Sequence, residues 1–224
     1  MKLLWKKWFS YIIPINLSKK NSIYSGELTL LYDKGELRLD TSKATYSHGL
    51  KYFALNRAFE LIDFSSIHHV LSLGYGMGSI SSLLRLYVPN CIMQIDAVEI
   101  DPEILSLVQA HSDTVPSIHY IHQDAYDYIH TCNKKYDLIV IDIFIHDSVP
   151  LHFDDYDFLN ACKSCLIDNG YIIFNRLNTG ILETKRNEKY FATIFQPLFN
   201  ITSIHEIRNN CIMIGQKNLR YNKK

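Results

Sequence analysis

Three glycines follow a short apolar run in the first half of the sequence. Gly74, Gly76 and Gly78 interrupt the stretch VLSLGYGMGSISSLLRLY, which then resumes with helical spacing. Glycine lets the chain turn sharply and lets a ligand approach the backbone without meeting a Cβ. In an open parallel sheet, ligands collect at the carboxyl ends of the strands, where such turns lie. Taken alone, the three glycines also fit a tight strand-to-helix turn that binds nothing.

An acidic residue ends the next apolar run. Glu99, in DAVEIDPEIL, lies about twenty residues after the glycines and is placed to accept hydrogen bonds from the ribose hydroxyls of an adenosine. The alternative is a solvated acid at a strand end. Asp101 precedes Pro102 and is predicted to cap the helix that begins there, because its side chain can accept from free backbone N–H groups.

A second acid follows the third apolar run, in HQDAYDYI. Asp124 is positioned to accept from an adenine amine, with Ala125 leaving room beside the ring, or to cap the next helix, and the two roles are compatible. The glycine pattern is Gly-x-Gly-x-Gly, and Ser79 stands where the dinucleotide fingerprint needs its last glycine. The order of these residues therefore favours an S-adenosyl ligand over NAD and matches a class I methyltransferase fold.

A carboxylate also ends the fourth apolar run, YDLIVID. Asp142 is expected to project into the same crevice as the glycine turn and Glu99. The loop after it is expected to cover an acceptor pocket, and its candidate substrate residues are His146, Asp147, Pro150 and His152. Its histidines and acids straddle a proline with no recognised ligand spacing, so the sequence predicts no metal site.

The elements that must position these residues alternate along the chain. Short β-branched runs over 70–74, 94–100, 119–122, 136–143 and 171–175 are separated by helical patterns over 79–87, 102–111, 125–131 and 156–166. This alternation predicts an α/β fold with a Rossmann-like parallel sheet and helices on both faces. A helix near 182–195 precedes two runs joined by Arg208-Asn209-Asn210, so the last strand is expected to run antiparallel.

The N-terminal part has a different pattern. GELTLLYDKGELRLD alternates around a turn-forming Asp-Lys-Gly and predicts a β-hairpin, followed by a helix that links it to the sheet. The domain boundaries predicted from this reading divide the chain into five parts. They are a basic and aromatic arm (1–21), the hairpin region (22–45), the linking helix (46–66), the Rossmann-like S-adenosyl-binding domain (67–217) and a tail (218–224).

Composition disfavours some classes of partner. Lys plus Arg and Asp plus Glu both total 23, so no net charge favours nucleic acid or anionic lipid. The N-terminal arm is interrupted by Lys6, Lys7 and Pro14, which predicts neither a signal peptide nor a membrane span and leaves a partner chain or a membrane surface open. The odd, scattered set of five cysteines suits reduced thiols in a cytoplasmic protein.

Together these motifs resemble the spermidine synthase family, polyamine aminopropyltransferases built on the class I methyltransferase fold. The resemblance lies in LSLGYGMG, VEID, QDA and YDLI through Asp142, with Tyr46 near the start of the linking segment, and covers roughly residues 23 to 217. It implies S-adenosylmethionine or its decarboxylated form as co-substrate, a small-molecule acceptor such as an amine, and catalytic roles for Asp142 and Tyr46. A homodimer is left open.

Two departures from the family pattern bear on the acceptor. Ile143-Phe144-Ile145-His146 replaces the acidic motif that follows the catalytic aspartate in spermidine synthases, and Tyr46-Ser47-His48 lacks the family's glutamate. A desolvated dication needs such carboxylate partners, and Asp147, Asp154 or Asp155 are the candidates to replace them. The sequence therefore predicts methyl or aminopropyl transfer to a small nucleophile, with Asp142 as proton acceptor. The alternatives are a regulatory S-adenosyl-binding protein that has lost catalysis and, less favoured, an NAD-dependent oxidoreductase.

Overall fold

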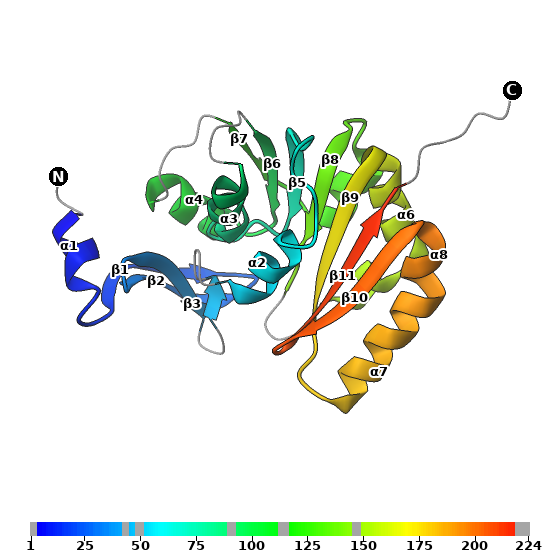
Figure 1. Ribbon diagram of the computed structural model, residues 1–224. Helices are drawn as coiled ribbons and strands as arrows, with labels where there is room; N and C mark the ends of the chain where they lie inside the picture. The colour runs from blue at the N-terminus through cyan, green and yellow to red at the C-terminus, as the bar shows by residue number, and fades with distance from the viewer. Residues whose placement is uncertain are drawn as a thin grey trace, which may run out of the picture.

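A seven-stranded sheet forms the centre of the molecule (Figure 1). The computed structural model describes residues 4–41, 45–47, 52–88, 93–111, 117–144 and 149–217. The strand order is β10-β11-β9-β8-β5-β6-β7. The strands are β5 (His69–Leu73), β6 (Gln94–Glu99), β7 (Ile118–His122), β8 (Tyr136–Ile141), β9 (Leu166–Leu177), β10 (Ile201–Ile207) and β11 (Asn210–Gln216). The strands from β9 to β7 are parallel, whereas β11 is antiparallel to both of its neighbours, as the sequence predicted.

Helices cover both faces of this sheet, which confirms the predicted α/β class. They are α3 (Ser79–Tyr87), α4 (Pro102–His111), α5 (Ala125–Thr131), α6 (Tyr156–Cys165), α7 (Ile181–Tyr190), a π-helical segment η3 (Phe191–Phe195) and α8 (Gln196–Leu198). Strand residues alternate between two cores, because successive side chains point to opposite faces. Leu138 and Val140 pack with α3 and α4, while Ile139 and Ile141 pack with α5 and α6.

The turn between β10 and β11 differs in one detail from the expectation. Arg208 has a φ of 55°, so this arginine, and neither of the two asparagines after it, takes the left-handed conformation. Its guanidinium lies 4.0 Å from the ring centroid of Phe53, which offsets part of the backbone strain.

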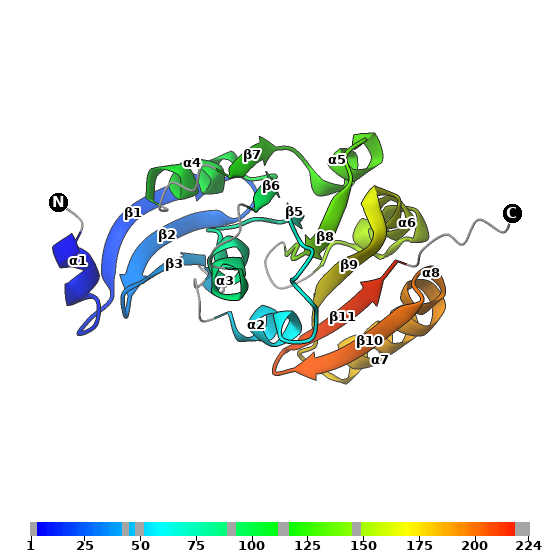
Figure 2. The ribbon, with the colours of Figure 1, turned by 45° about the horizontal axis from the view of Figure 1, so that its top comes forward.

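A second, four-stranded antiparallel sheet lies beneath α3 and α4 in Figure 1, and Figure 2 shows its strand β1 alongside α4. Its strands are β1 (Ile15–Ser22), β2 (Gly26–Asp33), β3 (Glu36–Thr41) and β4 (Thr45–Ser47). The hairpin between β2 and β3 is confirmed, with positive φ at Lys34 and Gly35. Strand β1 corrects the predicted arm, because residues 15–21 pair with β2 rather than standing apart from the sheet.

The helix that links the two sheets is shorter than predicted. A helix, α2, covers only Phe53–Phe59, and its buried residues are Ala54, Leu55, Ala58 and Phe59. Tyr46 lies in strand β4 and not at the start of that helix, which corrects the prediction. A short helix α1 (Leu4–Phe9) precedes β1. In the described part of the chain, no helix combines the length and apolar character that crossing a bilayer requires.

Candidate functional site

The glycine turn joins β5 to α3 at the carboxyl edge of the large sheet. Gly74, Gly76 and Gly78 have φ values of 81°, 55° and 83°, which favour glycine over any residue with a Cβ. A Cβ at Gly74 would overlap the backbone carbonyl of Asp142, so this glycine also permits a close approach of two strand exits. The Asp142 N–H donates to the carbonyl of Leu73 at 2.9 Å and fixes that approach.

Glu99 supports the turn from the neighbouring strand. Its carboxylate accepts from the Gly76 N–H at 2.9 Å and from the Asp101 N–H at 3.0 Å. The side chain is 3% exposed, and burial raises its pKa although the backbone donors oppose that rise. Each carboxylate oxygen can accept a second hydrogen bond, so ribose hydroxyls remain compatible with these contacts. The ribose contact predicted for Glu99 is therefore compatible with this geometry and stays a prediction.

Asp101 and Asp124 both cap helices. Asp101 accepts from the Glu103 N–H at 3.0 Å, as predicted, and from the hydroxyl of Ser22 at 2.5 Å, which ties β1 to the site. Asp124 accepts from the Tyr126 N–H at 2.7 Å. Ala125 follows it and is buried. The Gln123 N–H donates to the Glu99 carbonyl, so the exits of β6 and β7 lie side by side. The adenine contact proposed for Asp124 stays a prediction.

Asp142 lies at the exit of β8 within a three-residue network. Its Oδ1 accepts from the Tyr52 hydroxyl at 2.7 Å and from Asn175 Nδ2 at 2.8 Å, and Asn175 Nδ2 also donates to the Tyr52 oxygen at 2.5 Å. Burial raises the pKa of Asp142 to about 6, although these two donors lower it. Burial and the charge of Asp142 raise the pKa of Tyr52. The network thus holds a carboxylate that is more basic than an ordinary aspartate.

Asn175 has a further acceptor in this network. The residue is fully buried, and its Oδ1 has no hydrogen-bond partner among the residues that the structure describes. Sequence reasoning missed both Tyr52 and Asn175. A signal for Asn175 existed, because it is a polar residue near the end of an apolar strand that lies beside the strand carrying Asp142. Tyr52 carries no comparable signal, since it precedes a helix of ordinary core spacing.

The loop after Asp142 is described only in part. His146 and Asp147 lie outside the described residues, as does His48. Pro150 precedes the 3-10 turn η2 (Leu151–Asp154), and His152 is exposed there with its ring 4.1 Å from that of Phe153. The side chain of Tyr46 is likewise not described. The structure therefore brings together the glycine turn, Glu99 and Asp142, and leaves the predicted roles of Tyr46 and of the loop untested.

Two of the loop acids are already engaged. Asp154 accepts from Arg176 Nη1 at 2.5 Å and pairs with Arg186. Arg176 is 2% exposed, donates to Asn187 Oδ1 at 2.8 Å and lies 4.4 Å from the ring centroid of Tyr190. Asp155 caps α6 through the Phe158 N–H at 2.7 Å. Asp154 is thus neutralised by two arginines and Asp155 caps a helix, so both carboxylates already have partners, and their replacement of the family's missing acids stays a prediction.

A cavity adjoins the glycine turn without reaching the carboxylates of the site. Its volume is about 260 Å³, and it is lined by Tyr75, Met77 and Gly78 of the turn together with residues of the β2–β3 hairpin, α3 and α4, but not by Glu99, Asp124 or Asp142. Among the described residues, no group of three or more histidines, cysteines or acids is arranged to hold a metal ion. The predicted absence of a metal site stays a prediction, because His146 and Asp147 lie outside the described residues.

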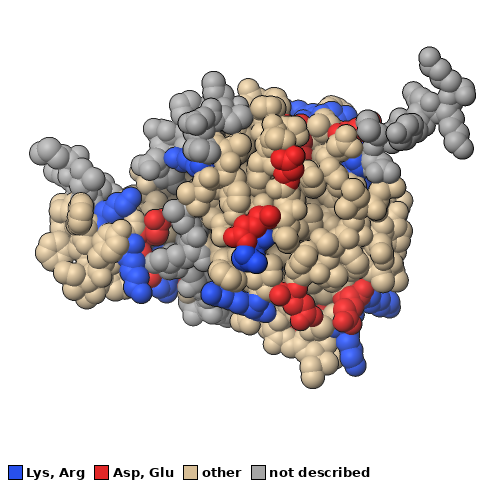
Figure 3. All heavy atoms as spheres, in the orientation of Figure 1, with Lys and Arg blue, Asp and Glu red and all other residues tan. Residues whose placement is uncertain are grey.

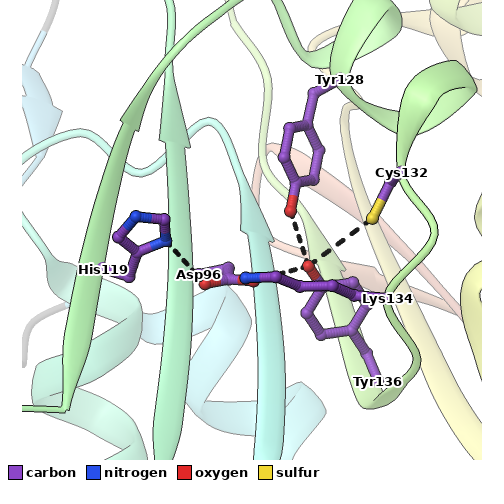
Figure 4. A network of polar contacts seen from close by, with 6 residues as sticks. All are labelled: Asp96, His119, Tyr128, Cys132, Lys134 and Tyr136. Atoms are coloured by element: carbon purple, nitrogen blue, oxygen red, sulfur yellow. Dashed lines mark hydrogen bonds and ion pairs between the residues drawn. The ribbon is translucent and has the colours of Figure 1, made fainter.

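A cluster of polar side chains lies near α5, at the end of the large sheet opposite to the glycine turn (Figure 4). Asp96 accepts from Lys134 and from the Tyr136 hydroxyl, each at 2.7 Å, and contacts His119 Nδ1 at 3.1 Å. Burial alone would raise the pKa of Asp96, but these partners outweigh it and lower the pKa. The cluster is anchored near the amino ends of β6, β7 and β8, far along the strands from the glycine turn, and its contacts are structural.

Comparison with known proteins relates the chain to methyltransferase domains and to a polyamine aminopropyltransferase. The family described as "Methyltransferase domain" matches residues 71–174. A polyamine aminopropyltransferase of Vibrio vulnificus (strain CMCP6) is 30% identical over 149 residues, which are 64% of this chain and 49% of that protein. The chain thus spans about half the length of that relative.

Solved structures agree on the fold. A probable spermidine synthase from Corynebacterium glutamicum superposes with a TM-score of 0.73 and 18% identity, covering 89% of this chain and 80% of that one. Human methyltransferase-like protein 13, solved in complex with SAH, gives a TM-score of 0.59 and 23% identity over 78% of this chain and 83% of that one. The protein therefore has the class I methyltransferase fold and, within that fold, resembles the polyamine aminopropyltransferases.

Proposed function

We propose that the protein transfers a methyl or aminopropyl group from S-adenosylmethionine, or from its decarboxylated form, to a small nucleophile. The observation that carries this proposal is the network at Asp142. A carboxylate with a pKa of about 6 lies beside the glycine turn and is held by two side-chain donors. Such a group is ionised at neutral pH and can still accept a proton readily.

The glycine turn and Glu99 are proposed to hold the donor. Glu99 would accept from the ribose hydroxyls, and the left-handed glycines leave the backbone open to close approach. The human structural neighbour was solved with SAH, which supports an S-adenosyl ligand for this edge of the sheet. When bound, the donor would supply a sulfonium-activated carbon.

Asp142 is proposed to accept the proton of the nucleophile. An amine is cationic at neutral pH and must lose a proton before its lone pair can attack. The nitrogen–carbon bond forms as the sulfur–carbon bond breaks, and the proton passes to the carboxylate and then to solvent. Tyr52 and Asn175 are positioning residues in this scheme, because both donate to Oδ1 and fix the direction of the carboxylate.

The acceptor is expected to differ from a diamine. The two acidic motifs that would hold the second ammonium group of a diamine are replaced in this sequence. Asp154 pairs with arginines, and Asp155 caps α6. We therefore expect putrescine to be a poor acceptor and the decarboxylated donor to lose its advantage over S-adenosylmethionine. The four described cysteines are free thiols, and we place the reaction in the cytoplasm.

A regulatory protein that binds the donor without chemistry is the second candidate. The replaced residues after Asp142 favour it, whereas the retained network at Asp142 favours an enzyme, since simple binding needs no carboxylate of raised pKa. An oxidoreductase is disfavoured by β11, whose antiparallel insertion between β9 and β10 is absent from the dinucleotide-binding sheet.

The test is a direct product assay. Purified protein is incubated with either donor and with putrescine, spermidine and several monoamines, and methylthioadenosine or S-adenosylhomocysteine is measured by mass spectrometry. We expect one of these products, and expect Asp142→Asn to abolish it while donor binding survives. Asp157→Asn, an exposed carboxylate on α6, is the matched control. Donor binding without product would favour the regulatory alternative, and rapid aminopropyl transfer to putrescine would overturn the expected specificity.

A further inference from the structure

The N-terminal end of the molecule presents an unusual concentration of exposed apolar side chains. Each member of this N-terminal aromatic patch is more than half exposed, from 54% for Phe9 to 78% for Ile12. The patch consists of Trp5, Trp8, Phe9, Tyr11, Ile12 and Ile13. It lies on α1 and the turn that follows, at the end of the molecule away from β10 and α7 (Figures 1 and 2).

This segment is held in place by the hairpin of the small sheet. Ser10 is 1% exposed, its carbonyl accepts from the Lys34 N–H at 2.8 Å, and its hydroxyl accepts from the Gly35 N–H at 2.9 Å. The Tyr11 ring lies so close to Gly35 that a Cβ there would overlap it. The aromatic rings contact one another, as Trp5 does Phe9 at 6.0 Å between centroids, and remain outside the core. The fold therefore fixes these side chains outward.

The charged side chains of the N-terminal segment itself are all basic. The first 26 residues contain five lysines and no acidic residue, and Lys6 and Lys7 lie between the two tryptophans. Lys19 and Lys20 pair with acids. Neither Lys6 nor Lys7 forms an ion pair with any residue that the structure describes, and Lys34 is exposed at the adjoining turn. Figure 3 shows basic side chains beside the tan surface at this end of the molecule, with acidic side chains farther in among them.

We infer that the N-terminal aromatic patch docks on an anionic membrane surface. Tryptophan and tyrosine favour the interface between headgroups and acyl chains, while nearby lysines are attracted to anionic headgroups. A second copy of the chain suits the patch less well, because a two-fold interface would bring Lys6 and Lys7 of one copy towards those of the other. This inference is independent of the proposed reaction.

The protein carries its own probe for the test. Trp5 and Trp8 are its only two tryptophans, so tryptophan emission reports on the patch alone. The full chain is titrated with vesicles of phosphatidylcholine and of phosphatidylcholine mixed with phosphatidylglycerol, and binding is checked by co-sedimentation. We expect a blue shift and co-sedimentation with the anionic vesicles, weakened by added salt, and little of either with the neutral ones.

Two double variants separate the contribution of the lysines from that of the apolar side chains. Lys6→Glu with Lys7→Glu is expected to weaken binding to anionic vesicles by about tenfold or more. Ile12→Ser with Ile13→Ser keeps both tryptophans and is also expected to weaken it. The matched control is Ile181→Ser with Leu182→Ser, which removes comparably exposed apolar surface from α7 and should leave binding unchanged. Circular dichroism confirms that each variant is folded.

Three results would overturn the inference. The first is no binding of the wild-type protein to anionic vesicles. The second is equal binding to neutral and anionic vesicles that neither salt nor the lysine reversal reduces. The third is a blue shift that grows with protein concentration in the absence of vesicles and accompanies a dimer in sedimentation velocity, which would assign the patch to a second copy of the chain.

Discussion

At the scale of single residues, the proposed chemistry depends on how Asp142 is held. Both side-chain donors reach the same carboxylate oxygen, Oδ1, from segments 90 and 33 residues away in the sequence. Because Oδ1 accepts both hydrogen bonds, Oδ2 is the oxygen that we expect to accept the proton. Tyr52 and Asn175 lower the pKa of Asp142 while burial raises it, and the balance leaves the pKa at about 6.

This balance predicts the pH dependence of the reaction. Turnover should rise as Asp142 ionises, through a limb near pH 6. Tyr52→Phe removes one donor to the charged form, so the pKa of Asp142 should rise and the limb should move to higher pH by roughly one unit. The measurement is kcat/KM against pH for both proteins. Tyr156→Phe, at an exposed position on α6, is the control. An unmoved limb in Tyr52→Phe would remove Tyr52 from the network.

Glu99 gives a second prediction at this scale. Glu99→Ala should weaken binding of methylthioadenosine or S-adenosylhomocysteine by roughly 1–3 kcal/mol, because a charged acceptor is lost. Glu99→Gln keeps an oxygen for the Gly76 N–H and should lie between the alanine variant and wild type. Calorimetry measures the three affinities, with the exposed Glu188→Ala as control. Equal affinity in Glu99→Ala and wild type would exclude Glu99 from the site.

The residues of the site were predictable in part. Glu99 and Asp142 end apolar strands, and parallel strands bring such ends to one edge, so periodicity alone placed them together. Tyr52 was not predictable in this way, because its position depends on how the segment before α2 packs across the sheet exits. The roles of Tyr46, His146, Asp147, Pro150 and His152 stay predictions, since the described residues do not test them.

At the scale of elements, the turn after β5 and the exit of β8 must fit each other closely. Gly74 and Gly26 both have left-handed φ values, 81° and 71°, but they differ in their surroundings. A Cβ at Gly74 would overlap the Asp142 carbonyl, whereas a Cβ at Gly26 would meet nothing within 4 Å. The pair therefore separates the cost of backbone strain from the cost of crowding.

We expect Gly26→Ala to lower the free energy of unfolding by about 1 kcal/mol, from strain alone. Gly74→Ala should lower it by at least about 2 kcal/mol more, because the backbone of Asp142 must shift. Urea unfolding measures both. If the two variants lose the same stability, the contact between the glycine turn and Asp142 is looser than described, and Gly74→Ala should then also retain activity.

Helix bounds were easier to predict than the small sheet. The bounds of α3, α4 and α5 match the sequence analysis, because glycine, proline or a capping aspartate marks where each begins. Strand β1 was missed because its sequence, INLSKKNS, is mostly polar and shows little of the alternation that marks a half-buried strand. Its pairing with β2 depends on a neighbour rather than on its own composition.

At the scale of the whole molecule, the carboxylate that serves the reaction destabilises the fold above its pKa. The pKa of Asp142 is raised from an ordinary value near 4 to about 6, so the folded state binds this proton more tightly than the unfolded state. The stability that this proton contributes is complete below about pH 4. It is lost as the pH rises through 6.

Asp142→Asn should therefore stabilise the protein at pH 8 while abolishing turnover. The amide oxygen can still accept from Tyr52 and Asn175, and no buried charge remains. We expect a gain of roughly 1–3 kcal/mol in the free energy of unfolding at pH 8 that disappears near pH 4. Unfolding curves at several pH values, with Asp157→Asn as control, measure it. A variant less stable than wild type at pH 8 would contradict the proposed burial of charge.

Two consecutive residues of strand β9, Asn175 and Arg176, contact different parts of the molecule. Asn175 holds Asp142, and Arg176 holds Asp154 and Asn187 on the other face. Since adjacent side chains of a strand point to opposite faces, inserting or deleting one residue before this pair would exchange them. The guanidinium of Arg176 would then lie on the face of Tyr52 and Asp142, and Asp154 and Asn187 would lose their contact with it. We therefore expect β9 to tolerate substitutions more readily than insertions or deletions of single residues.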